Sequence, residues 1–399
     1  MSTDQLPDAE AVRWAIAHSD QLGQYTFGKR YGSGNSSRQF VEHEGRLYAA
    51  DGLIVAAHTH QYSSLEPNPG QSFHGTTGPA VLQSLGFQLR DGQPSTVEEE
   101  RAWRLSILRN LQARADRNGL LQAGDVRAVH AFDNYRGIWV DKERTGSLHP
   151  AGVTIGLMHT GIHYPDEIDD DSALYQYPRT RRPGQDRSEI AASKAAAELA
   201  LPVFVVSQRG DLRSVRLGWV ADWDDRLERF LVSFGSTPPA KILDQELLDD
   251  RPFELEGNRR RRRTGTVTTR PDQARFKLEV FKRYGAVCPL SGLAVYAMLE
   301  AAHLRPDAAN GSSDPRNGIV LNAALHRALD AHLFAIHPET LEVMTTPSGP
   351  TIAALGIKAP HLDRRGRLPH QEALRWRYES WLKANRLTPT EAVPPTAAA

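Results

Sequence analysis

Five consecutive arginines, Arg259 to Arg263, constrain the fold of this chain more than any other feature. Arginine side chains are almost never buried without a partner, so no hydrophobic core can run through five in a row. The run is therefore expected to be a solvated linker or a contact for a polyanion. The chain has 399 residues, which predicts two or three domains of ordinary size.

The charge of the chain is unevenly distributed, although 48 basic and 48 acidic side chains give a net charge of zero. Residues 1–130 carry a formal charge of −2, residues 131–245 carry −3, and residues 246–399 carry +5. Nucleic-acid binding usually needs a basic surface, so the C-terminal region is the part whose charge suits a polyanion. The first two regions are expected to bind DNA through a local pocket and a few arginines.

Cys288 is the single cysteine, which excludes an internal disulfide and a zinc site of four cysteines or of two cysteines and two histidines. We therefore expect no structural zinc, and Cys288 is expected to be a small buried residue. A chain poor in cysteine is typical of a reducing cytosol. The N-terminal residues lack the pattern of a signal peptide, and no segment approaches ~18 consecutive apolar residues. A cytoplasmic protein with no membrane partner is expected.

The N-terminal part has the pattern of a small α+β module. An apolar side predicts a helix over residues 9–22, and EGRLY at 44–48 predicts a hairpin turn into a strand. The segment DGLIVAAH, residues 51–58, is compatible with a helix start or a second strand. We place this head domain at residues 1–93 and a connecting helix at 94–119, where acidic residues come early and basic residues late.

The middle part is rich in short β-runs separated by turn residues. These six runs are VRAVHAF, GIWV, VTIGLMH, LPVFVVSQ, VRLGWVADW and RFLVSF. One helix interrupts them, with Ser188 as its expected N-cap. Strands around one helix predict a curved sheet or partial barrel, which we place at residues 120–250. An Arg-rich linker at 251–269 follows.

The C-terminal part, residues 270–389, contains three polar residues whose neighbours are apolar, and the tail at 390–399 is expected to be disordered. His303 ends a predicted strand, Asn317 starts the next element, and His326 lies on a predicted helix. A strand, a loop, a strand and a helix can bring all three to one edge. A nuclease needs such a group, because an imidazole takes a proton from the attacking water while a divalent metal contacts the scissile phosphate.

The stretch CPLSGL…LEAAHLRP…DPRNGIVLNAALHRALDAHLFAIHP resembles HNH endonucleases of the ββα-metal type. The resemblance covers roughly residues 276–340 and implies a metal-dependent hydrolase that cuts DNA phosphodiesters. It implies that His303 is the general base, that Asn317 orients this base or holds the loop, and that His326 is a metal ligand.

The second metal ligand is a point of departure from that family. Many HNH enzymes carry it directly before the base histidine, where this chain has Ala302. The second ligand is then expected from Glu300 or Asp330, and Asp330 lies four residues after His326 on one helix face. Carboxylate and imidazole together suit Mg²⁺ or Mn²⁺.

The run GIHYPDEI…LPVFVV resembles SRA-type readers of modified bases, which belong to the PUA superfamily. The resemblance implies that a modified base is flipped out of the duplex, stacked between aromatic rings and hydrogen-bonded along its Watson–Crick edge. Asp186 would accept a hydrogen bond from an exocyclic amine. The alternative is that the tyrosines belong to the core. The expected pocket residues are Trp139, Tyr164, Tyr175, Tyr177 and Asp186.

The segments AIAHSDQLGQYTFGKRYG, EGRLYAADGLIVAAH and FHGTTGPAVLQSLGFQL resemble the head domain of McrA-like modification-dependent endonucleases. This chain has Asp51 where that family has a lysine, so phosphate contacts are expected elsewhere in the head. The alternative is a structural or dimerising domain. The basic residues expected to contact the DNA backbone are Lys29, Arg30, Arg179, Arg181, Arg182, Arg259, Arg260, Arg261, Arg262 and Arg263.

These parts together predict an α+β multidomain, type IV restriction-like endonuclease of phage defence. Its partner is double-stranded DNA carrying a modified base, with 5-methylcytosine and a phosphorothioate among the open possibilities. One HNH site per chain and two strands to cut imply a homodimer. Two alternatives remain: an HNH nuclease without modification dependence (a repair enzyme or toxin-like effector), and a catalytically inactive protein that binds modified DNA.

Overall fold

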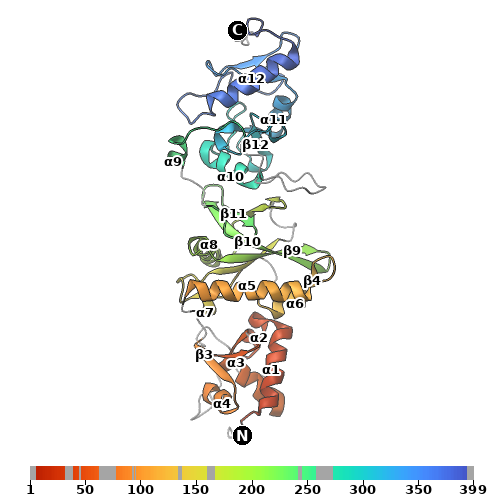
Figure 1. The fold of residues 1–399 in the computed structure, drawn as a ribbon, viewed down its shortest axis with the longest axis vertical. Coiled ribbons are helices and arrows are strands. Elements are labelled where there is room, and N and C mark those ends of the chain that lie inside the picture. Colours follow the sequence, from red (N-terminus) through yellow and green to blue (C-terminus); the bar gives the residue numbers. More distant parts are fainter. Residues whose placement is uncertain are drawn as a thin grey trace. The chain divides into compact units, whose positions relative to one another are not determined.

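The structure is a computed structural model in which the chain forms two compact units (Figure 1). The first unit comprises residues 1–166, 176–223 and 232–240, and the second comprises residues 167–175, 224–231 and 241–399. Within the described ranges, no helix combines the length and the apolar character needed to cross a membrane. The described residues are 6–31, 39–44, 46–62, 78–91, 94, 96–133, 137–159, 167–240, 245–257 and 273–392.

The head of the first unit packs helices against a three-stranded antiparallel sheet of order β2-β1-β3. Helix α1 (Ala9–Leu22) begins at Asp8, whose side chain accepts hydrogen bonds from two backbone N–H groups, and ends at Gly23, where φ is +80°. Residues 51–58 lie in a helix, so the helix alternative for this segment is correct. The other elements are α2 (Gln24–Tyr31), β1 (Gln39–His43), β2 (Arg46–Ala49), α3 (Ala50–Tyr62), α4 (Gly78–Ser84) and β3 (Gln88–Asp91).

The middle of the chain is rich in strands, as predicted. Five of the six expected β-runs are confirmed, as β5 (Gly137–Val140), β6 (Thr154–His159), β9 (Pro202–Arg209), β10 (Leu212–Asp224) and β11 (Arg229–Phe234). Three short strands add to them, namely β4 (Leu120–Gln122), β7 (Glu167–Ile168) and β8 (Ser172–Gln176). The sheet order is β5-β6-β9-β10-β11-β8-β7, with β4 paired to β10. Strands β6 and β9 run parallel, and β5–β6 and β9–β10 are antiparallel.

Two local predictions for the middle part are wrong. The run VRAVHAF is not a strand, because α6 (Ala123–Ala128) occupies its first half with a capping box between Gln122 and Asp125. Helix α8 (Pro183–Glu198) has its N-cap at Arg182 and not at Ser188. Pro183 starts it without loss of a hydrogen bond, since the first N–H groups of a helix have no intrahelical partner.

Helix α5 (Val97–Arg114) is the predicted connecting helix, and it carries charged residues into the core. Glu100 and Arg104 are both fully buried and form an ion pair at 2.8 Å. Arg144 lies in the short helix α7 (Lys142–Thr145), whose N-cap is Asp141, and pairs with the other oxygen of Glu100, also at 2.8 Å. Arg104 Nη1 donates to the backbone carbonyls of Thr154 and Pro202, which ties the helix to β6 and β9.

The second unit is built around a ββα core packed against α10 and α12. Cys288 lies in its hydrophobic core and is fully buried, as predicted. The elements are α9 (Gln245–Asp249), α10 (Gln273–Tyr284), β12 (Leu299–His303), β13 (Gly318–Asn322), α11 (Ala323–Asp330), β14 (Phe334–Ile336), β15 (Val343–Thr345) and α12 (Gln371–Asn385), with 3-10 helices at Tyr296–Met298, Asp307–Ala309 and Pro315–Asn317.

Candidate nuclease site

The three polar residues singled out in the sequence lie on one hairpin and the helix that follows it. Strands β12 and β13 are antiparallel, and their register places His303 opposite Gly318. Asn317 directly precedes β13, and α11, which carries His326, starts at the end of that strand. Asn322 caps the helix by accepting a hydrogen bond from Leu325 N at 2.9 Å. The order strand, strand, helix is the predicted one.

His303 ends β12 with its ring stacked on an aromatic side chain. The ring of Phe276 from α10 lies parallel to the imidazole, with centroids 3.6 Å apart and an interplanar angle of 9°. The backbone carbonyl of His303 accepts a hydrogen bond from Arg377 Nη2 at 2.8 Å. A Cβ at Gly318 would lie only 2.8 Å from the Phe276 ring, so glycine is needed for this close packing.

Asn317 is fully buried and uses its side chain to hold the loop that leaves His303. Its Oδ1 accepts from Arg305 N at 2.9 Å. Its Nδ2 donates to the carbonyls of Arg305 and Ser312, at 3.0 and 2.9 Å. Within this loop Gly311 approaches the backbone of Arg305 so closely that a Cβ there would collide with the carbonyl oxygen. The amide of Asn317 therefore fixes both ends of the loop.

His326 lies between two carboxylates. Its Nδ1 is 2.6 Å from Glu300 Oε2, and its Nε2 is 3.4 Å from Asp330 Oδ2. The side chains are 24%, 45% and 54% exposed for His326, Glu300 and Asp330, so the group is open to solvent. Among the residues that the structure describes, no set of three or more His, Cys, Asp and Glu side chains is arranged to hold a metal ion.

Arg377 was not predicted from the sequence, although it contacts two of the predicted residues. Its Nη2 donates to the His303 carbonyl and also to Asp330 Oδ1, at 3.2 Å. Burial lowers the pKa of Arg377, and the nearby Asp330 carboxylate opposes that effect. The sequence does contain a signal that Arg377 is buried. It lies three residues after Leu374 and four before Trp381, so it shares a helix face with these two buried residues.

The expected base-pocket residues of the middle part are mostly buried. Tyr175 and Tyr177 lie in the core at 4% and 5% exposure, in agreement with the alternative interpretation of these residues. Trp139 packs beside a hydrophobic cluster, and Tyr164 lies outside the described residues. Both carboxylate oxygens of Asp186 accept hydrogen bonds from Thr180, each at 2.7 Å.

The expected backbone-contact residues are exposed wherever they are described. The bonds between Asp186 and Thr180 fasten the loop on which the exposed Arg179, Arg181 and Arg182 lie. Arg30, at the end of α2, is exposed and lies 5.6 Å from the centroid of the Tyr31 ring. The side chain of Lys29 and the residues Arg259, Arg260, Arg261, Arg262 and Arg263 lie outside the described part of the chain.

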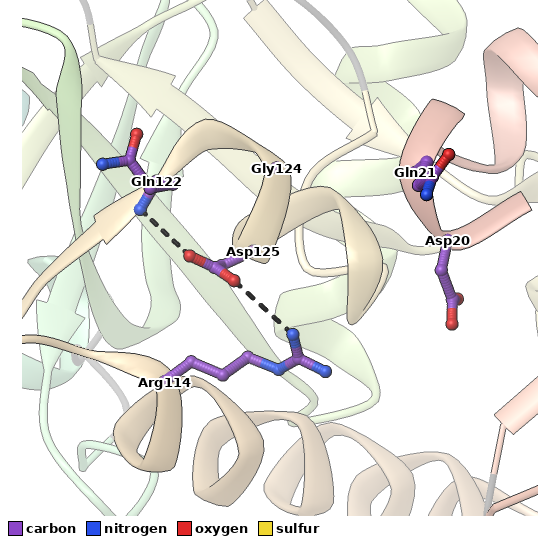
Figure 2. Close-up of a pocket in the computed structure, with 6 residues that line it drawn as sticks. All are labelled: Asp20, Gln21, Arg114, Gln122, Gly124 and Asp125. Carbon is purple, nitrogen blue, oxygen red and sulfur yellow. Dashed lines mark hydrogen bonds and ion pairs between the residues drawn. The ribbon is translucent and has the colours of Figure 1, made fainter. Parts of the chain in front are cut away.

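An open hollow of about 460 Å³ lies in the first unit, and its lining includes none of these residues (Figure 2). Arg114 pairs with Asp125 across it at 3.5 Å, and Asp125 also accepts from Gln122 N at 3.2 Å. Of the charged groups drawn there, Arg114 and Asp125 thus bind one another, and Asp20 pairs with Arg46 at 2.9 Å. The lining residues are Asp20, Gln21, Arg114, Gln122, Gly124 and Asp125.

Two parts of the chain match known families. Residues 6–91 match the family described as "ScoMcrA-like, N-terminal head domain", and residues 288–337 match the family described as "HNH endonuclease". The chain carries a ScoMcrA-like head domain and an HNH endonuclease domain. The HNH match spans the hairpin and helix that carry His303, Asn317 and His326, and it makes the chain a DNA-hydrolysing nuclease. The α+β multidomain fold class is confirmed.

Several solved structures are distantly similar to the chain. They include the modification-dependent TagI restriction endonuclease (16% identity, 65% of this chain, 90% of that chain, TM-score 0.27). The SUVH5 SRA domain in complex with methylated CHH DNA is similar at 17% identity (31% of this chain, 89% of that chain, TM-score 0.23). The type IV phosphorothioation-dependent restriction endonuclease ScoMcrA is similar at 13% identity (95% and 100%, TM-score 0.20). A search of curated proteins found no match. At TM-scores this low, none of these likenesses carries an argument.

Proposed function

We propose that this chain is a modification-dependent DNA endonuclease, in which the head and middle parts select modified DNA and the HNH domain hydrolyses it. The observation that carries the proposal is the ββα unit, with His303 at the strand end and His326 between two carboxylates, in a chain that begins with a ScoMcrA-like head. Neither alternative, a nuclease without modification dependence or an inactive DNA-binding protein, is favoured by these features.

The hydrogen bond of Glu300 assigns different roles to the two carboxylates. At 2.6 Å, Glu300 Oε2 can accept a hydrogen bond from His326 Nδ1, and in that tautomer the lone pair of the imidazole lies at Nε2. That lone pair faces Asp330 Oδ2 at 3.4 Å, and both atoms are acceptors. A divalent cation bound by both acceptors would relieve their mutual repulsion. The donor set therefore fits Mg²⁺ or Mn²⁺, with His326 and Asp330 as ligands and Glu300 orienting the imidazole.

His303 is the general base of the proposed reaction. Its imidazole takes a proton from the water that attacks phosphorus, which leaves a 5′-phosphate and a 3′-hydroxyl. When bound, the divalent ion stabilises the charge on the leaving 3′ oxygen. Stacking on Phe276 holds the plane of the ring, and Asn317 holds the loop that follows the strand. Asn317 thus acts as the loop-holding residue of the two roles expected for it.

The described flanks of the arginine run support its proposed contact with the DNA backbone. On one side Gly257 N donates to Asn310 O at 2.9 Å, and Glu256 pairs with Arg305 at 3.0 Å. On the other side α10 carries Phe276, the residue under the His303 ring. Both described flanks of the run thus attach to the nuclease unit.

The middle part is proposed to read the modified base. The exposed arginines at 179, 181 and 182 suit phosphates, and Asp186 positions their loop. Because Tyr175 and Tyr177 belong to the core, the aromatic residues proposed for the pocket are Trp139 and Tyr164. The modification that the middle part recognises is either a modified base, such as 5-methylcytosine, or a modified backbone linkage, such as a phosphorothioate. Plasmids carrying one or the other distinguish these two classes. Because each chain has one HNH site, we propose a homodimer that cuts both strands.

A digestion of matched plasmids tests the proposal. Plasmids that are unmodified, 5-methylcytosine-modified or phosphorothioate-modified are incubated with the full chain in Mg²⁺, Mn²⁺ or EDTA. We expect one modified plasmid to be cut, only with metal, and His303→Ala to lose the activity by at least about 10²-fold. His361→Ala, an exposed histidine of the same unit, is the matched control. Cleavage that survives His303→Ala removes the assigned base, and equal cutting of all plasmids removes the modification dependence.

A further inference from the structure

We infer that Arg377 is a positioning residue of the nuclease site, which sets the place of the Asp330 carboxylate relative to the strand end that presents His303. The inference rests on the proposed function, since it concerns the general base and a metal ligand named there.

Arg377 reaches the site from the last helix of the chain. Helix α12 packs on β14 and β15 through a buried cluster that includes Tyr378, Trp381 and Leu382. On the same helix Arg377 is only 3% exposed. A single nitrogen, Nη2, donates to the His303 carbonyl at 2.8 Å and to Asp330 Oδ1 at 3.2 Å. One guanidinium nitrogen therefore connects the end of β12 to the end of α11.

A buried guanidinium is an expensive way to fill a core position. Removing a charge from water costs several kcal/mol, and an apolar side chain of similar size is often neutral or stabilising in such a place. The Nε of Arg377 is buried without a hydrogen-bond partner within the described structure. Its one carboxylate partner, Asp330, is 54% exposed, so the ion pair is partly screened. What the guanidinium supplies beyond packing is the geometry of its two bonds.

The bond to Asp330 selects which of its oxygens faces His326. Arg377 holds Oδ1, and Oδ2 is then the oxygen that lies 3.4 Å from His326 Nε2. The rotation of the carboxylate is thereby fixed, and one oxygen is directed to the proposed metal position.

The bond to the His303 carbonyl couples this carboxylate to the base. The residue before His303 is Ala302, whose methyl group cannot bind a metal ion. The base and the ligand carboxylate therefore come from separate elements, β12 and α11, that are joined through Arg377. A shift of either element changes the distance between the proton acceptor and the metal, and misplacement by about 1 Å can lower a rate by about 10²-fold.

The test compares Arg377→Met and Arg377→Lys with Arg375→Met, an exposed arginine on the same helix. Mn²⁺ binding is measured by titration calorimetry on the DNA-free full chain, together with the thermal midpoint and with kcat and KM on the cleaved plasmid. We expect Arg377→Met to keep the thermal midpoint, to bind Mn²⁺ on the order of 10–100-fold more weakly, and to lose kcat with little change in KM. Arg377→Lys is expected to lose less of each, because an ammonium makes part of the bridge.

Wild-type Mn²⁺ affinity and kcat in Arg377→Met overturn the inference. If that variant does not fold, unchanged Mn²⁺ affinity and kcat in folded Arg377→Lys overturn it instead, and a loss with an unchanged thermal midpoint supports it. If His303→Ala abolishes DNA cleavage while Arg377→Met keeps its Mn²⁺ affinity and kcat, only this inference is refuted and the proposed function stands. A wild-type chain that neither binds Mn²⁺ nor cuts DNA refutes the proposed function itself.

Discussion

Two buried arginines, Arg104 in the first unit and Arg377 in the second, lie in opposite kinds of surroundings. Arg104 is fully buried, and so is its partner Glu100. Its other bonds go to backbone carbonyls inside the same core. Arg377 is just as deep, but its carboxylate partner Asp330 is half exposed and also faces His326. The first arginine connects core to core, whereas the second connects core to an open site.

These two arrangements distinguish a structural ion pair from a functional one. In the first unit two acids, Glu100 and Asp141, lie with the bases Arg104 and Arg144, and all four are buried. Such a cluster fixes α5 against the sheet and offers nothing to a ligand. In the second unit the acids at 300 and 330 remain accessible and can exchange a protein contact for a metal ion. Exposure of the acidic partner, more than burial of the arginine, marks the functional site.

We call the buried group of Glu100, Asp141, Arg104 and Arg144 the closed cluster. The largest expected effect comes from removing the charge of Glu100 at its centre. Glu100→Gln leaves two buried guanidinium groups facing each other without their shared anion. We expect the free energy of unfolding to fall by about 3–5 kcal/mol, measured by urea denaturation. Mn²⁺ affinity should not change while the protein is folded, because the metal residues belong to the other cluster.

Glu98→Gln is the matched control for this prediction. Glu98 lies on the same helix, is 78% exposed, and its contact to Arg101 spans 4.0 Å. An exposed pair of this kind contributes about 0–1 kcal/mol, so the control should keep nearly full stability. If both variants lower the free energy of unfolding by the same small amount, the closed cluster does not hold α5 against the sheet as described above.

Glu300, His326 and Asp330 form the open cluster. Substitutions there should lower the affinity for Mn²⁺ and leave the free energy of unfolding nearly unchanged. In the proposed site Glu300 orients His326 and Asp330 binds the metal, so we expect Glu300→Gln to weaken Mn²⁺ binding on the order of 10–100-fold, equivalent to about 1.4–2.7 kcal/mol. Asp330→Asn removes a ligand and should weaken binding further. Titration calorimetry on both variants ranks the two losses. The reverse order would exchange the roles of the two carboxylates.

The two clusters also show what could be predicted from the sequence. The ββα unit was predictable, because His303, Asn317 and His326 lie within 24 residues and their spacing is local. Arg377 was not, because its partners lie 74 and 47 residues away in the sequence. The bonds of Arg104 to Thr154 and Pro202 were not predictable for the same reason, since these residues are 50 and 98 positions from it in the sequence. Contacts of this range are decided by packing, which periodicity does not describe.

Local rules failed at the starts of two helices, α6 and α8. VRAVHAF has the β-branched residues of a strand, but the Gln122–Asp125 capping box starts a helix there. Ser188 does not cap α8, because Pro183 occupies the first helical position and Arg182 precedes it as the N-cap. Both errors are outside the nuclease site, where the predicted order of strand, strand and helix is confirmed.

The smallest expected effect concerns the balance of charge inside the closed cluster. Burial raises the pKa of Asp141 in the folded protein, although Arg144 opposes this through its N–H bond and its charge. A raised folded pKa means that the folded state holds the proton more tightly than the unfolded chain does. The stability from this group is therefore present at low pH and lost as pH rises through the folded pKa.

Asp141→Asn keeps an oxygen for the cap of α7 without the charge, so it should be slightly more stable than wild type at pH 7. Urea denaturation at pH 7 and pH 5 should show this advantage shrinking as the pH falls. A loss of stability at pH 7 would instead show that the ionised Asp141 balances Arg144, in which case the closed cluster needs both of its acids charged.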